Sequence, residues 1–243
     1  MVSDEDLKKV LDGEKKLEGA DLSGANLAWM NLNRVDLEGA NLKGANLEGI
    51  DLEWANLKGA NLTDANFMDA HVLEANLVDT NLEGANFRQA QFNGSDFRQA
   101  NLEGVSAVQT FLIDAHLTDA NLKGADLNNA DLTDANLKDA NLTDANLTWV
   151  DLNRANLKGA NLKGANLKGA NLPDADLNRA NLKGANLKGA NLRSVDLRNA
   201  NLEGADFELV NLSGAKLAGM DLRSVDLKNA NLIYADLEDA KGV

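Results

Sequence analysis

The chain has 243 residues, of which 44% are hydrophobic, 4% are aromatic and none is cysteine, so disulfides and thiolate metal sites are excluded. Its formal net charge is −14, and residues 1–120 carry −12 of this while residues 121–243 carry −2. Neither direct nucleic-acid binding nor a membrane span is expected, because phosphates need a basic surface and the sequence contains no long apolar run.

The first residues predict a short helix. The opening MVSDED is acidic and has no apolar core, so it is not typical of a secretory signal, and we expect a cytoplasmic protein, with a trimmed exported form left open. Ser3 suits an N-cap, Gly13 suits a helix stop, and between them one helical face is apolar: Leu7, Val10 and Leu11. We therefore expect a capping helix over about residues 4–12, lying across whatever structure follows.

From residue 20 to residue 239 a five-residue word, A-[DN]-L-x-x, repeats 44 times without insertion or deletion. The central residue is Leu in 37 words and Phe in five, and the residue two before it is Ala in 32. None of the 88 positions in these two columns carries a charge, although 26% of the chain is charged. Since burying an unpaired charge is costly, both columns must face inward.

Five residues match neither the helix period of about 3.6 nor the strand period of about 2. Three residues of each word alternate inward, outward and inward, as in a strand, and Gly two places after the centre in 17 words suits a turn with positive φ. Stacked coils would then lay each central side chain on the one below, which predicts an all-β solenoid stabilised by neighbour contacts. The Asn or Asp that precedes the centre in 38 words is interpreted as structural, bonding to nearby backbone.

The words ADLSG (20–24) and ANLKG (160–164) resemble the pentapeptide-repeat family, and their simple form is similar to its cyanobacterial-type members. The resemblance covers residues 20–239 and implies a right-handed quadrilateral parallel β-helix with four words per coil, hence about 11 coils and a shaft roughly 50 Å long. We expect three segments: a capping helix and lead-in over 1–19, the β-helix over 20–239, and a C-terminal tail over 240–243.

The repeat departs from its own rule between residues 71 and 116. The column before the centre has six exceptions, five of them in this range: His71, Gln91, Ser106, Phe111, His116 and Lys216. At 20 residues per coil, three of these fall in one column and outward apolar residues accompany them. We call the following residues the candidate patch: Met68, His71, Leu73, Gln91, Val108, Phe111 and Ile113. Two interpretations stay open, a protein-binding surface and a local repacking around additional Phe residues with a bulge that hides some side chains.

Bulkier residues mark the last coils, and no terminal helix pattern follows them. We call four of them the C-terminal contact group: Leu209, Met220, Ile233 and Tyr234. They would seal the end of the shaft or join two copies end to end, unless the last coil frays. A monomer and an end-to-end dimer are both compatible with the sequence.

No constellation of catalytic or metal-binding residues is apparent. The two histidines, His71 and His116, fall on different sides of the expected shaft, no serine has an evident base beside it, and a convex shaft offers no concave site. We expect no enzyme activity, no cofactor and no metal. The preferred interpretation is a non-catalytic binding or scaffold protein that presents flat faces to a protein partner, either as a regulator or as a consensus-like engineered shaft.

The resemblance also implies an alternative, a DNA-mimicking inhibitor or protector of type II topoisomerases of the quinolone-resistance branch. The rod shape and the acidic N-terminal half favour it. The unbroken frame, which leaves no room for a loop insertion, weighs against it. So do the lysines that interrupt the acidic surface: Lys158, Lys163, Lys168, Lys183 and Lys188.

Overall fold

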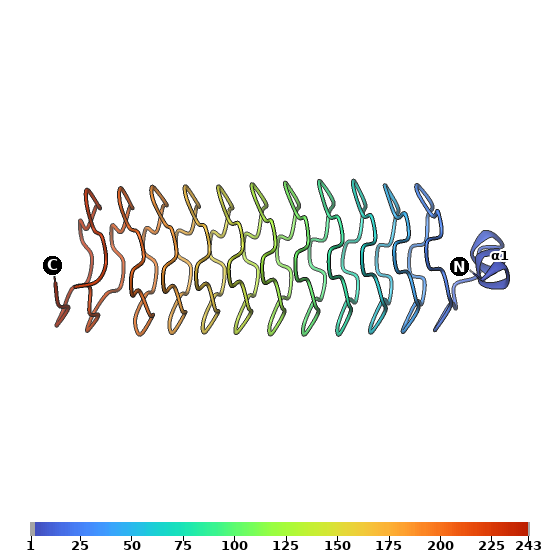
Figure 1. Cartoon of the computed structure of the whole chain (residues 1–243), viewed down its shortest axis with the longest axis horizontal. Coiled ribbons are helices and arrows are strands. Elements are labelled where there is room, and N and C mark those ends of the chain that lie inside the picture. The colour runs from blue at the N-terminus through green and yellow to red at the C-terminus, as the bar shows by residue number, and fades with distance from the viewer. Residues whose placement is uncertain (1–2, 243) are drawn as a thin grey trace.

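The computed structural model describes residues 3–242 as a rod of stacked coils with the helix α1 at one end (Figure 1). The coils are joined by single parallel bridges between residues 20 apart, from Lys16↔Asp36 to Asp221↔Lys241, and no longer strand forms in the described residues. Each bridging residue is the one that precedes the centre of a word. The predicted right-handed quadrilateral parallel β-helix is confirmed, with one word on each of four sides.

The helix α1 (Asp4–Leu11) closes the N-terminal end of the rod (Figure 1). It begins where the Ser3 hydroxyl oxygen accepts a hydrogen bond from the Asp6 backbone N–H at 3.3 Å. Val10, on its apolar face, is only 1% exposed. The predicted cap is therefore confirmed to within one residue. In residues 3–242 α1 is the one helix, and it is not long or apolar enough to cross a membrane.

Each word turns a corner immediately after its buried centre. In the word centred on Leu162, the carbonyl of that residue accepts a hydrogen bond from the Ala165 backbone N–H at 3.0 Å. Gly164 occupies the third position of this turn with φ of 68°, as a type II turn requires. Leu162 and Ala165 are both 0% exposed, so the turn points its apolar ends into the shaft. The inward assignment of these two columns is confirmed.

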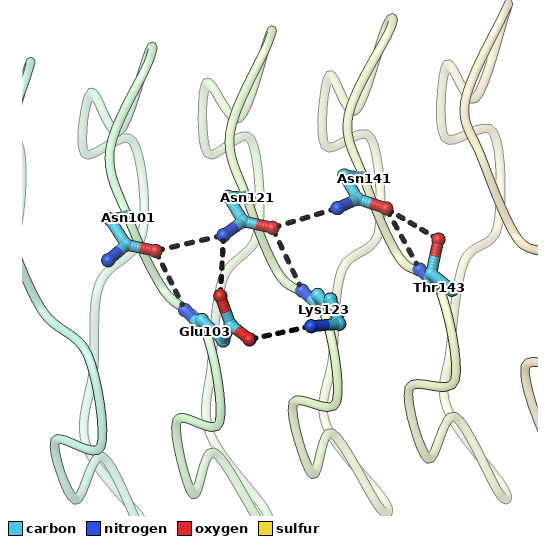
Figure 2. Close-up of polar contacts among 6 residues, drawn as sticks. All are labelled: Asn101, Glu103, Asn121, Lys123, Asn141 and Thr143. Atoms are coloured by element: carbon cyan, nitrogen blue, oxygen red, sulfur yellow. Dashed lines mark hydrogen bonds and ion pairs between the residues drawn. The ribbon is translucent and has the colours of Figure 1, made fainter.

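Asparagine side chains form hydrogen-bonded ladders between successive coils on the outside of the shaft (Figure 2). The Asn121 amide nitrogen donates to the side-chain oxygen of Asn101 at 3.0 Å, and the Asn121 side-chain oxygen accepts from the amide of Asn141 at 2.9 Å. The same oxygen also accepts from the Lys123 backbone N–H at 3.3 Å. One side chain thus satisfies its own turn and joins three coils, which confirms the structural interpretation of this column.

On one side of the shaft, backbone hydrogen bonds between two coils are missing near the C-terminal end of the described structure. The Leu182 and Gly184 N–H groups donate to the next coil at 2.8 and 2.9 Å. One coil later on the same side, the equivalent N–H groups of Leu202 and Gly204 make no such bond within the described residues. The two edges, over 199–203 and 218–224, line a slot of about 430 Å³. The other three sides of the last coil remain paired with the coil before it. The final coil is therefore held less completely than any earlier one.

Candidate protein-binding surface

The candidate patch lies where the sequence placed it. His71, Gln91 and Phe111 pair with one another in a single row of bridges, and the row continues to Asp51 at one end and to Asp131 at the other. Their backbone N–H groups donate to the preceding coil at 2.8, 2.9 and 3.0 Å. Since this ladder is unbroken, there is no bulge here to hide side chains.

The patch side chains differ in how much of their surface they present. Phe111 is 44% exposed, in a column that holds Asn or Asp in most other coils, and His71 is also exposed. The others are half-buried against the shaft: Met68, Leu73, Gln91, Val108 and Ile113. The candidate patch is thus a nearly flat, mainly apolar surface from which the ring of Phe111 projects.

Beneath the patch the interior is repacked around phenylalanine. Phe67 and Phe87 occupy one inward column with ring centroids 5.4 Å apart and planes at 87°, and Phe92 packs on Phe87 at 4.3 Å. Ala107 follows Phe87 in the next coil of that column and is 1% exposed. A small residue thus stands where a second large one would crowd the Phe87 ring. The repacking part of the alternative interpretation is confirmed, and it coexists with the exposed Phe111.

Three hydroxyl side chains are buried in the same coils, at positions that hold Ala elsewhere. Ser95 donates to the Val72 carbonyl oxygen at 2.5 Å and accepts from the Ala75 backbone N–H at 3.0 Å, which makes it a bridge between two coils. Thr80 and Thr110 each donate to a backbone carbonyl at 2.7 Å. The interior tolerates these hydroxyls because each one is hydrogen-bonded.

The two histidines do not form a common site. His71 belongs to the row of the candidate patch, whereas His116 pairs with Asp96 on a different side. A shallow groove of about 540 Å³ lies there, lined by Asp96, Arg98, His116, Thr118, Asn136 and Lys138. Burial alone would raise the pKa of Asp96, but two hydrogen bonds from Arg98 outweigh it and hold the pKa below its ordinary value. In residues 3–242 no group of three or more metal-ligating side chains converges.

The four residues of the C-terminal contact group differ in their exposure to solvent. Leu209, Ile233 and Tyr234 are 53%, 60% and 92% exposed, whereas Met220 is 6% exposed. Met220 lines the slot between the last coils and so faces inward rather than outward. The last coil also leaves Leu232 and Leu237 only partly buried, in contrast to the centres under α1. This end of the described structure carries no cap of its own.

The acidic residues around the candidate patch were not identified from the sequence. Carboxylates surround it on both of its sides, and their spacing of 20 residues could have revealed them. The clearest pair is Asp51 and Asp131, which lie in the same row, one before His71 and the other after Phe111. Glu74 is placed at the corner beside Leu73, where its side chain leans over the backbone of Gly94 in the next coil.

Comparison with known proteins assigns the family. The description "Pentapeptide repeats" matches eight times, over residues 16–104 and 112–241. The interval between the two blocks contains Ser106, Ala107 and Phe111, where the word is least regular. No curated protein sequence matches the chain.

Solved structures give the same result. HetL, described as a pentapeptide repeat protein involved in heterocyst differentiation regulation from the cyanobacterium Nostoc sp. strain PCC 7120, is 31% identical, with 99% of this chain and 96% of HetL covered and a TM-score of 0.42. A trypsin-treated form of QnrB1, a plasmid-mediated fluoroquinolone resistance protein, is 22% identical over 70% of this chain and 90% of its own, with a TM-score of 0.61. Rfr23 from the cyanobacterium Cyanothece 51142 is 25% identical over 70% of this chain and 92% of its own, with a TM-score of 0.20. With its word, its coil and these matches in agreement, the chain belongs to the pentapeptide-repeat family.

Proposed function

We propose that this protein is a non-catalytic binding scaffold and that the candidate patch is the surface that a protein partner contacts. The observation that carries the proposal is Phe111. An aromatic ring that is 44% exposed occupies a column whose ordinary Asn or Asp would bond to its own turn and to the next coil. Giving up those bonds for an exposed apolar ring contributes little to the shaft itself, and exposed apolar patches often mark partner surfaces.

The surroundings of Phe111 support the same reading. Ile113 stands beside it on the same coil, Val108 lies across the corner, and the ladder that fixes all three is intact. A flat, rigid face presents these side chains without loop motion, so that little ordering cost falls on the scaffold when a partner binds. The repacked phenylalanines below account for the shape of the interior, but they do not require Phe111 to be outside.

The experiment is a differential affinity capture from lysate of the source cells. The immobilised wild type is compared with the double variant Phe111→Asn, Ile113→Lys. The matched control is Ser213→Lys, because Asn211 already stands at the position equivalent to Phe111, exactly five coils of 20 residues further on. A protein captured by the wild type and by the control, but lost from the double variant, is the expected result. Equal capture by all three would show that the patch is not the binding surface.

The acidic N-terminal half keeps a second candidate, an inhibitor or protector of type II topoisomerases that imitates DNA. The charge of −12 over residues 1–120 favours it. The mixed charge of the second half weakens it, since Lys183 and Lys188 pair with Glu203 and Glu208 at 2.9 and 2.6 Å rather than leaving an acidic stripe. A gyrase supercoiling assay with the protein at micromolar concentration separates the two. No inhibition and no protection from a quinolone would remove this candidate.

A further inference from the structure

We infer that the occupant of the candidate patch is a cationic amphipathic segment of a protein, with apolar side chains on Phe111 and Ile113 and with Lys or Arg side chains on the carboxylates around them. The inference rests on the proposed function, because it names the chemistry of the partner at the same site. It comes from the charges that frame the patch, where acidic residues far outnumber basic ones.

The apolar part of the surface has a defined extent. Phe111, Ile113 and Val108 lie on one coil, while Met68 and Leu73 lie two coils earlier on the same two sides. Between them the intervening coil contributes mainly polar side chains, including Gln91. Two apolar bands separated by one polar coil suit a segment whose apolar residues recur at intervals, rather than one continuous hydrophobic surface.

A ring of carboxylates encloses these bands. Asp51 and Asp131 lie in the row of Phe111, on either side of His71, Gln91 and Phe111. Glu74 leans over Gly94 between the two bands, where a Cβ on that glycine would lie 2.5 Å from its carboxylate oxygen. Nine acidic residues lie on the two sides of the patch and at its corners: Glu48, Asp51, Glu53, Asp69, Glu74, Asp114, Asp126, Asp131 and Asp134. The same area holds a single basic residue, Arg88.

Eight of these nine carboxylates have no ion-pair partner within residues 3–242, and the ninth, Asp134, pairs with Arg154 of the next coil. Elsewhere some coils pair their charges with those of a neighbouring coil. Lys123 pairs with Glu103 at 2.9 Å, and Asp174 pairs with Arg193 at 3.4 Å. Around the patch one such pair, between Asp134 and Arg154, stands beside eight carboxylates without an ion-pair partner in residues 3–242. The negative potential there is therefore available to a ligand, and it favours cations and disfavours anions.

Together the two features specify the partner. Contact with Phe111 favours burial of an aliphatic or aromatic side chain, and the flanking carboxylates favour positive charge on either side of it. A purely basic segment would miss the first contribution, and an acidic apolar segment would be repelled by the second. A segment in which apolar and basic residues alternate meets both.

The test uses three labelled, amidated nine-residue peptides and fluorescence anisotropy on the full chain. LKLKLKLKL carries both features, SKSKSKSKS carries only the charge, and LELELELEL carries only the apolar residues. We expect the first to bind about tenfold more tightly than either of the others, and its affinity to fall steeply between about 50 and about 500 mM salt. Equal binding of the first two peptides would overturn the apolar half of the inference.

Two variants locate the binding. Phe111→Asn with Ile113→Lys should weaken LKLKLKLKL at least about tenfold, while Ser213→Lys should leave it within about twofold. Glu74→Gln with Asp114→Asn changes only exposed corner residues, leaves the fold intact, and should weaken the peptide and flatten its salt dependence. Peptide binding that neither variant alters lies elsewhere on the acidic shaft and would overturn the inference.

The outcome is distinguishable from failure of the proposed function. If a captured protein depends on Phe111 but none of the peptides binds at the patch, the patch is a partner surface and its partner is not cationic and amphipathic. If capture is the same for wild type and double variant, the proposed function itself is wrong.

Discussion

The indole ring of Trp149 lies over the backbone of Gly169, the corner residue of the next coil. A Cβ on Gly169 would come within 2.4 Å of the indole Cζ3. Trp29 covers Gly49 in the same way, at 2.2 Å. Both tryptophans are nevertheless mostly exposed, at 60% and 68%. The rings thus shield a stretch of backbone at the corners of the shaft without belonging to its core.

Replacing Gly169 with Ala should move the Trp149 ring into solvent. Gly189 is the control, because it lies in the same column with φ of 69° against 67° for Gly169 and has no atom within 4 Å of an added Cβ. Both substitutions incur the strain of a side chain at positive φ, about 1–2 kcal/mol. Only G169A should also shift the tryptophan emission to longer wavelength, measured in a background with Trp29→Phe and Trp54→Phe. An emission shift of equal size in G189A would contradict the contact.

Asn121→Asp should destabilise the shaft although the two side chains are nearly the same size. The carboxylate still accepts from Lys123 and Asn141, but it no longer donates to the Asn101 side-chain oxygen or to the Glu103 carboxylate, and it places a charge beside both (Figure 2). Losing this donor from a part-buried ladder should cost about 1–2 kcal/mol, measured by urea or thermal unfolding at neutral pH.

Asn231→Asp is the control for this loss. Asn231 is exposed in the last coil and donates to Asn211 at 3.2 Å, with no further described coil to bridge. Its replacement should cost less than half as much. Equal losses at the two positions would show that the donated bond contributes as much in the exposed last coil as in the middle of the shaft.

Acid should release the capping helix. One Asp6 carboxylate oxygen accepts from the Asp21 backbone N–H at 3.0 Å and the other accepts from the Lys9 ammonium at 3.0 Å. The bond from Asp21, with that from Lys9 second, lowers the pKa of Asp6 below its ordinary 3.8. A carboxyl group with a lowered folded-state pKa stabilises fully above its unfolded-state pKa, and the contribution is lost as pH falls through the folded-state value.

The measurement is the difference in Tm between the wild type and Asp6→Asn as pH is lowered. It should be constant at neutral pH and shrink once the pH falls below 3.8, because the asparagine cannot ionise. NMR shifts of the Asp21 amide should move over the same interval in the wild type alone. A Tm difference that does not depend on pH would mean that Asp6 does not hold α1 through its charge.

In the coil that contains Leu202, amide hydrogen exchange should be fast on one side only. The N–H groups of Leu202 and Gly204 border the slot, whereas those of Leu182 and Gly184, one coil earlier on the same side, are bonded. Exchange resolved by NMR should show the first pair losing protection at least about tenfold sooner, since an unpaired amide needs no opening step. Equal protection of both pairs would show that the slot is closed in solution.

Periodicity made most of the fold predictable. A column without a single charge, such as the one that contains Leu162, can only face inward, and a frame that never slips gives every later residue its side of the shaft. The capping helix followed equally from Ser3 and the apolar face behind it. These features depend on local chemistry that each word repeats, so one sequence is enough to show them.

The remaining features depend on how neighbouring coils fit together. The word around Leu202 differs from the word around Leu182 only in having Glu203 in place of Lys183 at an outward position, and yet only the first has lost its ladder. The half-burial of Ile113 likewise depends on the coil beside it. Ser95 was visible as an exception, but its role as a bridge from Val72 to Ala75 needs coordinates. The positions of the carboxylates around Phe111 could have been predicted, because the 20-residue spacing already assigns each of them to a side of the shaft.

Because each coil consists of four equal words, the number of residues between two surface features sets both the distance and the angle between them. Excising 20 residues, for example 121–140, would shorten the rod by about 4.8 Å and leave every downstream face in line. Excising five would turn all of the later surface by a quarter revolution, so that Trp149 would move to a neighbouring side relative to Phe111. Orientation and distance between surface features can thus be set independently by the number of residues removed.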